Sequence, residues 1–257
     1  MPTGLLKTYI KELTIDPQCE RHVRRRRLAG GYEEENGVRP YAAFLHFTED
    51  IHCSGAIVSA TSELTAAHCY IDTENVTNAY VFAGNVWFRN KEDFEPPTQT
   101  RRLKLCRSYN ALAVREFDIM ICRHEQPWNF DKYFVSPVQI FMFTERLNPG
   151  FKLRCQVAGF GRKETGLAVG YLHAYRQVME TWRACRDFAS EQFMCTTDTS
   201  NKTMCSGDAG GPVVCLVNRR LQLFGLLSAS SAPEEECCET PVAWNLVTFL
   251  GFFRPKK

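Results

Sequence analysis

The sequence predicts an all-β protein, and three observations support this. From residue 41 onward, short apolar stretches alternate with polar turns. No long segment has the periodicity of an amphipathic helix. The chain of 257 residues is 44% hydrophobic and 23% charged, which is the balance of a folded globular protein. The pattern is typical of β-barrels or a β-sandwich, organised as one large domain or two small ones.

The N-terminal segment differs from the rest of the chain. Residues 1–27 are polar and end in four consecutive arginines, Arg24 to Arg27. Gly30 and Gly31 follow, which is a sharp change into turn-forming sequence. We therefore expect a boundary at Arg27, with a separate segment over residues 1–27 and a folded domain over residues 28–257.

Strands are expected where apolar stretches lie between polar turns, at residues 42–47, 56–59, 79–82 and 117–121. The C-terminal end has a different pattern. After Pro241, apolar side chains follow helical spacing at Trp244, Val247, Phe249 or Leu250, and Phe253. This spacing predicts a short C-terminal helix.

Charge and hydropathy exclude several classes of protein. Thirty-one basic and 29 acidic residues give a formal net charge of +2, which does not indicate nucleic acid or a membrane surface as partner. No stretch approaches the roughly 18 apolar residues of a membrane span. Residues 1–27 also lack the apolar run of a secretory signal, so either the start lies upstream or the signal is absent from this chain.

Twelve cysteines are a high count, and such usage favours an oxidising compartment. The close pair, Cys237 and Cys238, is adjacent in sequence and does not have the spacing of zinc ligands. Disulfides and an extracellular location are therefore expected. Glycosylation sequons at Asn75 and Asn201 agree with secretion, and their alternative interpretation is two ordinary polar loops.

Three separated segments resemble a known family: residues 64–69 (LTAAHC), 117–121 (FDIMI) and 205–212 (CSGDAGGP). In order and context they are similar to the His, Asp and Ser segments of the chymotrypsin/trypsin-like serine peptidases. The resemblance implies two packed six-stranded antiparallel β-barrels with the site between them; the alternative is an unrelated disulfide-rich β protein. It spans residues 28 to 254 and continues at residues 28–31, 39–41, 53–56, 155–161 and 221–228.

The resemblance assigns a role to each residue of the site. His68 matches the general base and Asp118 the carboxylate that orients it. The backbone N–H groups of Gly207 and residue 209 match the oxyanion hole. Position 209, where the family has its serine nucleophile, is Ala209, whose methyl group can neither lose a proton nor attack a carbonyl. The resemblance therefore implies a protease homologue without its nucleophile.

Two alternative interpretations would make the protein an endopeptidase. Ser206 or Thr203 could act as nucleophile, or Ala209 could be an engineered substitution in an active enzyme. Alignment to the family places Ser206 beyond the oxyanion amides and Thr203 at the floor of the specificity pocket, so neither is expected beside His68.

The specificity pocket also departs from the family. Ser228 is retained, but Thr203 stands where trypsin-like enzymes have aspartate and Ala229 where the family has tryptophan. Ser230 and Val242 each replace a glycine. An engineered knockout would leave the pocket intact, so these departures favour a natural pseudoenzyme.

Members of this family are cut before a small apolar residue, and the new amino terminus pairs with the aspartate that precedes the nucleophile. Here that aspartate is retained as Asp208. The basic run favours cleavage after Arg27, which would bring the Leu28 ammonium against Asp208. The other interpretations of the run are a solvated basic linker and a heparin-binding patch.

The resemblance also implies a set of disulfides. Cys106 and Cys122 flank the Asp118 segment on strands that the family makes neighbours, so they are expected to pair. Cys19 would pair with whichever of Cys237 and Cys238 remains, or would link two copies of the chain. The other implied bridges are Cys53 with Cys69, Cys155 with Cys215, Cys185 with Cys195, and Cys205 with Cys237 or Cys238.

These features predict a secreted, non-catalytic serine protease homologue that acts as a binding or regulatory module in an extracellular protease cascade. Its expected partners are proteins: an active protease, an inhibitor or another cascade component, and an activating protease at Arg27. No cofactor is expected, and no metal site, since Asp72 and Glu74 are too few ligands for calcium. The alternative function is a serine-type endopeptidase.

Overall fold

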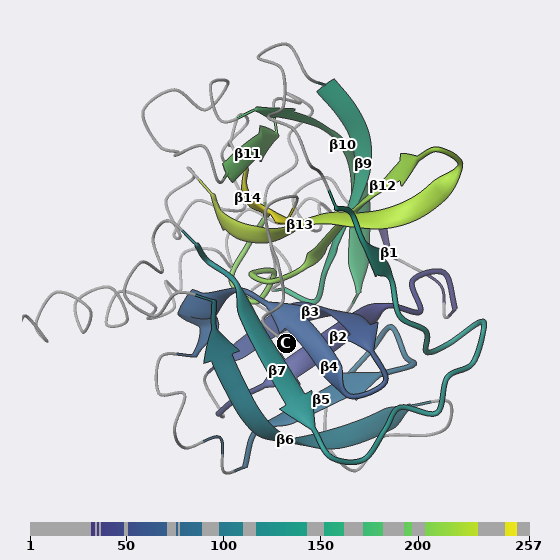
Figure 1. Cartoon of the computed structure of the whole chain (residues 1–257), viewed down its shortest axis with the longest axis vertical. Helices are drawn as coiled ribbons and strands as arrows, with labels where there is room; N and C mark the ends of the chain where they lie inside the picture. The colour runs from purple at the N-terminus through teal and green to yellow at the C-terminus, as the bar shows by residue number, and fades with distance from the viewer. Residues whose placement is uncertain are drawn as a thin grey trace, which may run out of the picture.

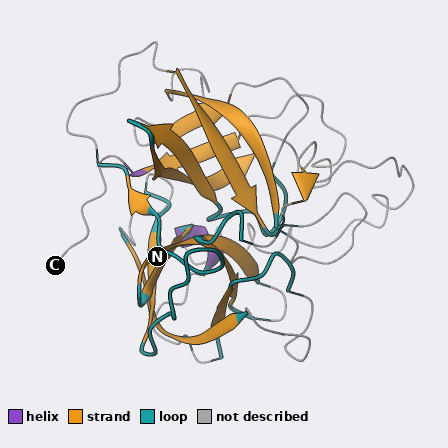
Figure 2. Ribbon diagram, turned by 90° about the vertical axis from the view of Figure 1, so that its right-hand side faces the viewer, coloured by secondary structure: helices purple, strands orange, loops and turns teal. Residues whose placement is uncertain are grey.

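The protein is built from two β-barrels that lie one above the other (Figure 1). Figure 2 shows each sheet curled on itself, with little helix in either. The computed structural model describes residues 32–33, 35, 37–48, 51–70, 76, 78–88, 98–109, 117–142, 152–161, 172–181, 193–196, 204–230 and 245–250.

The first barrel is closed and antiparallel, with the strand order β2-β3-β4-β7-β6-β5. Strands that are consecutive in the chain pair in most of this barrel, as β2 with β3, β3 with β4, β5 with β6 and β6 with β7. Their bounds are β2 (Ala42–His46), β3 (His52–Ser59), β4 (Ser62–Thr65), β5 (Tyr80–Ala83), β6 (Gln99–Ser108) and β7 (Met120–His124).

The second barrel has the order β10-β11-β14-β13-β12-β9, and antiparallel pairing of β9 with β10 closes it. Two short strands lie outside this ring. β1 (Tyr32–Glu33) pairs with β10, and β8 (Gln139–Ile140) pairs in parallel with β13. The ring strands are β9 (Lys152–Gly159), β10 (His173–Thr181), β11 (Phe193–Thr196), β12 (Pro212–Val217), β13 (Arg220–Ser230) and β14 (Asn245–Phe249).

The predicted architecture of two six-stranded antiparallel barrels is confirmed. The apolar stretches 42–47, 56–59 and 79–82 fall on β2, β3 and β5. The stretch 117–121 is only partly a strand, because β7 begins at Met120.

The predicted C-terminal helix is wrong over residues 245–249, which form β14. This strand lies between β11 and β13, and both Val247 and Thr248 are buried. A strand covered on both faces carries apolar residues without strict alternation, so a helical spacing can arise there by coincidence. Residues 251–257 lie outside the described residues.

Aromatic side chains pack between the two barrels. Phe44 on β2 stacks on Phe88 with ring centroids 5.7 Å apart. Phe88 in turn packs against Phe160, which follows β9 of the second barrel, at 5.4 Å. Phe44, Phe88 and Phe160 are all buried. Large aromatic rings contribute strongly through buried apolar area, so this cluster helps to fix the barrels against each other.

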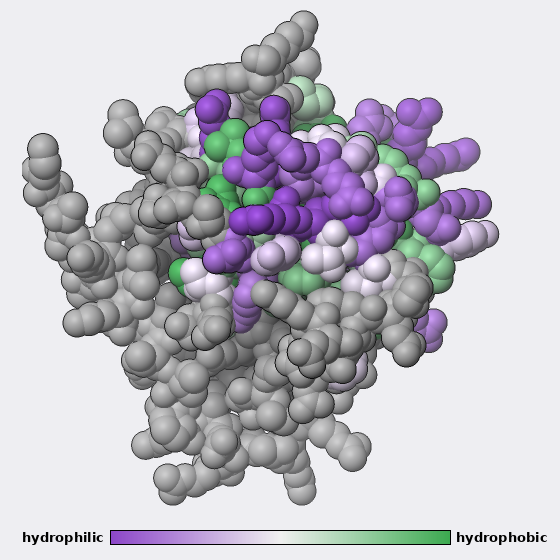
Figure 3. Space-filling view, turned by 90° about the horizontal axis from the view of Figure 1, so that it is seen from below, coloured by the Kyte–Doolittle hydropathy of each residue, from purple (hydrophilic) through white to green (hydrophobic). Residues whose placement is uncertain are grey.

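The outer face of the first barrel is polar. On β6, Leu103 and Cys106 are buried whereas Arg102, Lys104 and Arg107 are exposed. Figure 3, which views the molecule from the side of this barrel, shows hydrophilic side chains gathered on that face. This is the pattern of an antiparallel sheet with one face on the core and the other in water.

Three of the predicted disulfides are confirmed: Cys53–Cys69, Cys106–Cys122 and Cys155–Cys215. The second of these joins residues that are direct cross-strand partners in β6 and β7, as expected from its position beside the Asp118 segment.

The remaining cysteines are placed only in part. Cys195 is disulfide-bonded, and its predicted partner Cys185 lies outside the described residues. Cys205 is buried, and its predicted bridge stays a prediction. Bridging would require Cys237 or Cys238 to bring its Cα within about 7 Å of that of Cys205. Both predicted partners, and Cys19, lie outside the described residues.

Sequence analysis missed a buried polar cluster in the first barrel. Glu63 on β4 is fully buried, and its Oε1 accepts hydrogen bonds from Trp128 Nε1 at 2.6 Å and from His124 Nε2 at 3.0 Å. The other ring nitrogen of His124 donates to the Gln126 carbonyl at 2.7 Å. Burial raises the pKa of Glu63, while the hydrogen bond and charge of His124 act in the opposite direction. His124 is therefore the main group that compensates this buried carboxyl.

Replacing His124 by alanine should destabilise the fold by about 3 to 5 kcal/mol, because it leaves the buried Glu63 with only the hydrogen bond from Trp128 and without its ion-pair partner. Urea unfolding of the variant measures this loss. As a control, Lys104→Ala removes an ion pair to Glu125 in which both side chains are exposed, and it should change the midpoint little. Equal, small effects of the two substitutions would contradict the assigned role of His124.

Candidate functional site

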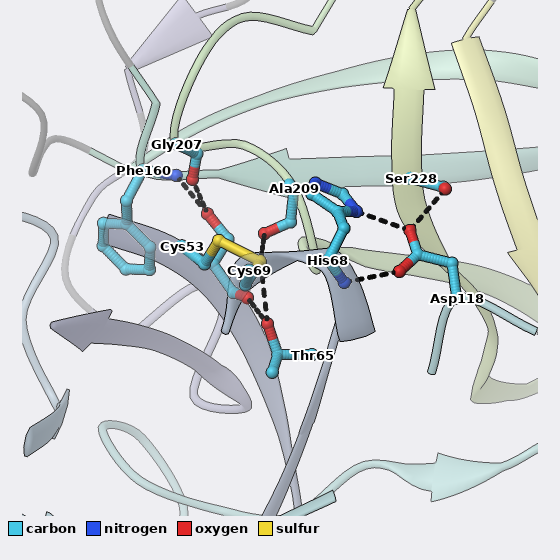
Figure 4. Close-up of a disulfide and its surroundings, with 10 residues drawn as sticks. Cys53, Thr65, His68, Cys69, Asp118, Phe160, Gly207, Ala209 and Ser228 are labelled. Carbon is cyan, nitrogen blue, oxygen red and sulfur yellow. Dashed lines mark hydrogen bonds and ion pairs between the residues drawn. A yellow bond between two sulfur atoms is a disulfide. The ribbon is translucent and has the colours of Figure 1, made fainter. Parts of the chain in front are cut away.

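The predicted site residues come together where the two barrels meet (Figure 4). His68 lies on the 3-10 turn η2 (Ala67–Cys69) of the first barrel, and Asp118 lies just before β7. Ser228 lies on β13 of the second barrel, and Ala209 lies in the segment before β12. The Cys53–Cys69 disulfide ties η2 to β3, which fixes the turn that carries His68.

His68 is held by Asp118 through two hydrogen bonds. The His68 ring Nδ1 lies 2.7 Å from Asp118 Oδ2, and the His68 backbone N–H donates to Oδ1 at 2.9 Å. The carboxylate is 5% exposed and the imidazole is 38% exposed. Because Oδ2 accepts the Nδ1 proton, the neutral ring has its lone pair on Nε2, the tautomer that a general base requires.

Ser228 adds a third hydrogen bond to the same carboxylate. Its hydroxyl donates to Asp118 Oδ2 at 2.5 Å, so both barrels contact the aspartate. Burial alone would raise the pKa of Asp118, but the charge and hydrogen bonds of His68, together with the hydrogen bond from Ser228, lower it overall. Asp118 therefore stays ionised at neutral pH and keeps the imidazole oriented.

The segment that carries Ala209 is fixed by Ser54 of β3. The Ser54 hydroxyl donates to the Gly207 carbonyl at 2.8 Å and accepts from the Phe160 backbone N–H at 2.8 Å. The Ser54 backbone N–H donates to the Ala209 carbonyl at 2.9 Å. One residue of the first barrel thus sets the position of both predicted oxyanion residues.

The backbone amides of Gly207 and Ala209 form no hydrogen bond within the described part of the chain. Neighbouring amides are engaged: Asp208 donates to the Cys205 carbonyl at 3.0 Å, Gly210 to the Leu227 carbonyl at 2.7 Å, and Gly211 to the Asp208 carbonyl at 2.9 Å. The two N–H groups that were predicted to form an oxyanion hole are therefore the ones available to an incoming acceptor.

Gly210 is required by its surroundings. Its φ is +79°, and a Cβ placed there would lie 2.1 Å from Thr65 Oγ1 and 2.3 Å from the Ser54 carbonyl oxygen. Any side chain would collide with β3 and β4, so the turn next to Ala209 can only be glycine.

Ala209, which was predicted to stand at the nucleophile position, lies beside the imidazole of His68 (Figure 4). It is buried, with 8% of its surface exposed. Its methyl group carries no proton that His68 could remove and no lone pair that could attack a carbonyl. Ser206, considered as a replacement nucleophile, is exposed. Thr203, the other candidate, lies outside the described residues.

Asp208 is buried beneath the site. It accepts backbone N–H bonds from Gly161 at 2.8 Å and Cys205 at 2.9 Å. No basic group of the described residues forms an ion pair with it. Burial raises the pKa of Asp208 to about 7 despite these two hydrogen bonds, and its charge contributes, after burial, to a raised pKa of the buried Tyr175. A Cβ at Gly159 would lie 2.2 Å from Asp208 Oδ1, so glycine there makes room for the carboxyl.

The other predicted residues are placed only in part. Ala229 and Ser230 lie at the end of β13, next to Ser228, and Ala229 is half-buried. The predicted residues outside the described part of the chain are Thr203, Val242, Arg27, Leu28, Asn75 and Asn201.

Sequence reasoning missed the supporting roles of Ser54 and of the glycines around Asp208. Ser54 lies in the segment 53–56, and Gly159 and Gly161 lie in the segment 155–161, both of which carry the family resemblance. The family resemblance of these two segments was the signal in the sequence that could have pointed to their supporting roles. What the sequence could not show is that one hydroxyl bridges two segments that are over 100 residues away from it.

Comparison with known proteins agrees with this fold. The family model described as Trypsin matches residues 28–246, which is most of the chain. The protein therefore belongs to the trypsin family of serine peptidases.

Individual relatives are distant. Human cathepsin G is 30% identical over 196 residues, covering 73% of this chain and 73% of the relative. Mouse ovochymase-2 is 27% identical over 202 residues, covering 74% of this chain and 32% of the relative. A dog protein named hepatocyte growth factor activator serine proteases is 23% identical over 222 residues, covering 79% of this chain and 33% of the relative. The chain matches only about a third of the length of these last two relatives.

Helices long and apolar enough to cross a membrane are not found among the described residues.

Asp208 should make the uncleaved chain less stable as the pH rises. Its folded pKa of about 7 lies above its ordinary value of 3.8, so its stabilising contribution is complete below pH 3.8 and is lost as the pH rises through 7. Asp208→Asn cannot ionise, and the difference in unfolding free energy between the two chains should shift in favour of the variant from pH 4 to pH 7. Urea unfolding across this range measures it. A difference that is independent of pH would show that Asp208 does not titrate there.

Proposed function

We propose that this protein is a non-catalytic member of the trypsin family, a pseudoprotease that acts as a binding or regulatory module in an extracellular protease cascade. The observation that carries the proposal is Ala209, which stands at the nucleophile position beside a hydrogen-bonded His68–Asp118–Ser228 group. The site has the base and its orienting carboxylate but no atom to attack a substrate.

The large loss of activity that follows removal of a serine nucleophile supports a non-catalytic role. Loss of the serine nucleophile in another serine protease lowers turnover by about a million-fold. This corresponds to about 8 kcal/mol of activation free energy, since each tenfold change is about 1.4 kcal/mol. The amides of Gly207 and Ala209 can still bind an oxyanion or a carbonyl oxygen, but binding alone does not break the peptide bond.

Retention of His68 and Asp118 does not require catalysis. Asp118 is buried, and a buried carboxylate without its partner would cost several kcal/mol of stability. His68 and Asp118 can therefore be retained in the sequence because the pair stabilises the fold.

The proposal includes an activation step. Residues 1–27 would be a pro-segment, cut after Arg27 by an activating protease. Asp208 supports this step, because it is buried, lacks an ion-pair partner among the described residues and has a pKa raised to about 7. The Leu28 ammonium would stabilise the ionised carboxylate and order the segment that carries Ala209.

An extracellular location and protein partners complete the proposal. Three disulfides agree with an oxidising compartment, and Asn75 and Asn201 would carry glycans. The partner would be an active protease, an inhibitor or another component of the cascade, bound across the cleft between the barrels. The alternative, a serine-type endopeptidase, is an outcome of the following test.

The back-substitution Ala209→Ser tests the proposal. The chain cut after Arg27 is incubated with a broad peptide-substrate library, with and without the substitution. We expect no hydrolysis by the unmodified chain. We expect little hydrolysis by the variant, because Thr203, Ala229 and Val242 replace residues that the family uses to hold substrate.

The double variant Ala209→Ser/His68→Ala controls for contaminating protease, since it has the new hydroxyl without the base. Strong hydrolysis by Ala209→Ser alone would show a competent pocket and an alanine that is the sole defect. Hydrolysis by the unmodified chain that His68→Ala abolishes would overturn the proposal.

Cleavage after Arg27 should reverse the effect of Asp208 on stability. With the Leu28 ammonium against it, the carboxylate would be favoured as the charged form, and its folded pKa would fall below the unfolded value. Asp208→Asn should then destabilise the cut chain at pH 7 but not the uncut chain. N-terminal sequencing of secreted protein that begins at any residue other than Leu28 would refute this step.

A further inference from the structure

Two histidines face each other across the β2–β3 hairpin, on the first barrel and apart from His68. His46 and His52 are direct partners in the strand register, and their Nδ1 atoms lie 3.0 Å apart. Both side chains are half-buried, so solvent reaches the pair.

The two rings meet by their nitrogen edges. Their centroids lie 4.8 Å apart, much farther than the two Nδ1 atoms, so each Nδ1 is on the edge of its ring that faces the other. In a neutral imidazole the nitrogen without a proton carries its lone pair in the ring plane. When both protons are on Nε2, the two Nδ1 lone pairs therefore point into one shared space.

Packing holds this arrangement. The His52 ring stacks on Phe44 with centroids 5.5 Å apart and planes inclined by 23°. Phe44 belongs to the aromatic cluster between the barrels, where it stacks on Phe88. The hairpin backbone is closed beyond the pair, since the Phe47 N–H donates to the Ile51 carbonyl at 3.0 Å. The two nitrogens are thus positioned before any ligand arrives.

We propose that His46 and His52 form a binding site for a divalent transition-metal ion of the zinc and copper(II) class, coordinated through both Nδ1 atoms. The described residues contain no cluster of three or more His, Cys, Asp or Glu side chains that could hold a metal. The pair therefore supplies two ligands, and water completes the coordination sphere.

The geometry suits this ion class. Zinc–nitrogen bonds are about 2.0–2.1 Å long, so two nitrogens 3.0 Å apart would enclose the ion at an angle of about 95°. This nitrogen–metal–nitrogen angle is close to that of square-planar coordination. Tetrahedral coordination would require the two nitrogens to move slightly apart. Imidazole is a preferred ligand of zinc and copper, whereas calcium and magnesium prefer oxygen ligands.

Metal binding rearranges the protons on the His46 and His52 rings. In the neutral metal-free pair, the Nδ1–H of one ring donates a hydrogen bond to the Nδ1 of the other. On binding, that proton is replaced by the ion, and the donating ring becomes the Nε2–H tautomer, so no net proton is lost. Because imidazole binds a metal ion through a deprotonated nitrogen, acid should weaken Zn²⁺ binding.

The ion would act close to the candidate functional site. His52 is followed directly by Cys53, which is in the disulfide to η2, and then by Ser54, which holds Gly207 and Ala209. An ion joining β2 to β3 would restrain this end of β3. The site thus offers a route by which a metal ion stabilises the segment around the candidate site, whether or not that site is catalytic.

Calorimetric titration of the full chain with Zn²⁺ tests the site, with Ca²⁺ as a control ion. We expect saturable binding of one Zn²⁺ per chain, an upward shift of Tm with Zn²⁺ concentration, and no response to Ca²⁺. His46→Gln and His52→Gln should each weaken Zn²⁺ binding at least about tenfold. His68→Gln is the matched control and should leave it unchanged.

Ring-nitrogen NMR separates the possible outcomes. Zn²⁺ should shift the Nδ1 signals of His46 and His52 and leave His124 unaffected. Circular dichroism of each variant without metal shows whether it is folded, so loss of binding is scored only in folded protein. Zn²⁺ binding that survives both His46→Gln and His52→Gln, or that is lost in His68→Gln, would overturn the proposal, as would the absence of saturable binding.

Discussion

The buried carboxylate of Asp118 is the contact on which the arrangement of the site depends. It accepts hydrogen bonds from the ring and backbone of His68 in the first barrel and from Ser228 in the second. The Asp118 carbonyl also accepts a hydrogen bond from Thr248 of β14 at 3.4 Å. A charge at this depth is tolerable only while these donors surround it, so the two barrels are held in the one relative position that keeps them all.

This constraint explains how the proposed pseudoprotease would keep an ordered site without a nucleophile. Exchanging a serine hydroxyl for the methyl of Ala209 removes the attacking atom but breaks none of the hydrogen bonds around Asp118, nor those from Ser54 to Gly207 and Ala209. The scaffold and the chemistry are therefore separable. In the proposed pseudoprotease, a site that keeps an oriented imidazole and two available amides would serve as a binding surface without hydrolysis.

The sequence predicts the parts of this structure that are encoded locally or by family motifs. The strand at residues 42–47 follows from its apolar run, and Cys106–Cys122 follows from its place beside Asp118. The helix expected near residue 245 is wrong, because burial of β14 on both faces hides its periodicity. The Glu63 cluster could not be predicted, since its two hydrogen-bond donors lie more than 60 residues away and only the fold brings them together.

In the proposed pseudoprotease, no group of the candidate site attacks an electrophile. The most direct test is the intact mass of the unmodified chain, cut after Arg27, after prolonged incubation with a fluorophosphonate that reacts with activated hydroxyl groups. We expect an unchanged mass, while an active trypsin-family enzyme treated in parallel gains one adduct. A single adduct on this chain that maps to a residue of the cleft and disappears in His68→Ala would contradict the account, because it would reveal a nucleophile other than residue 209.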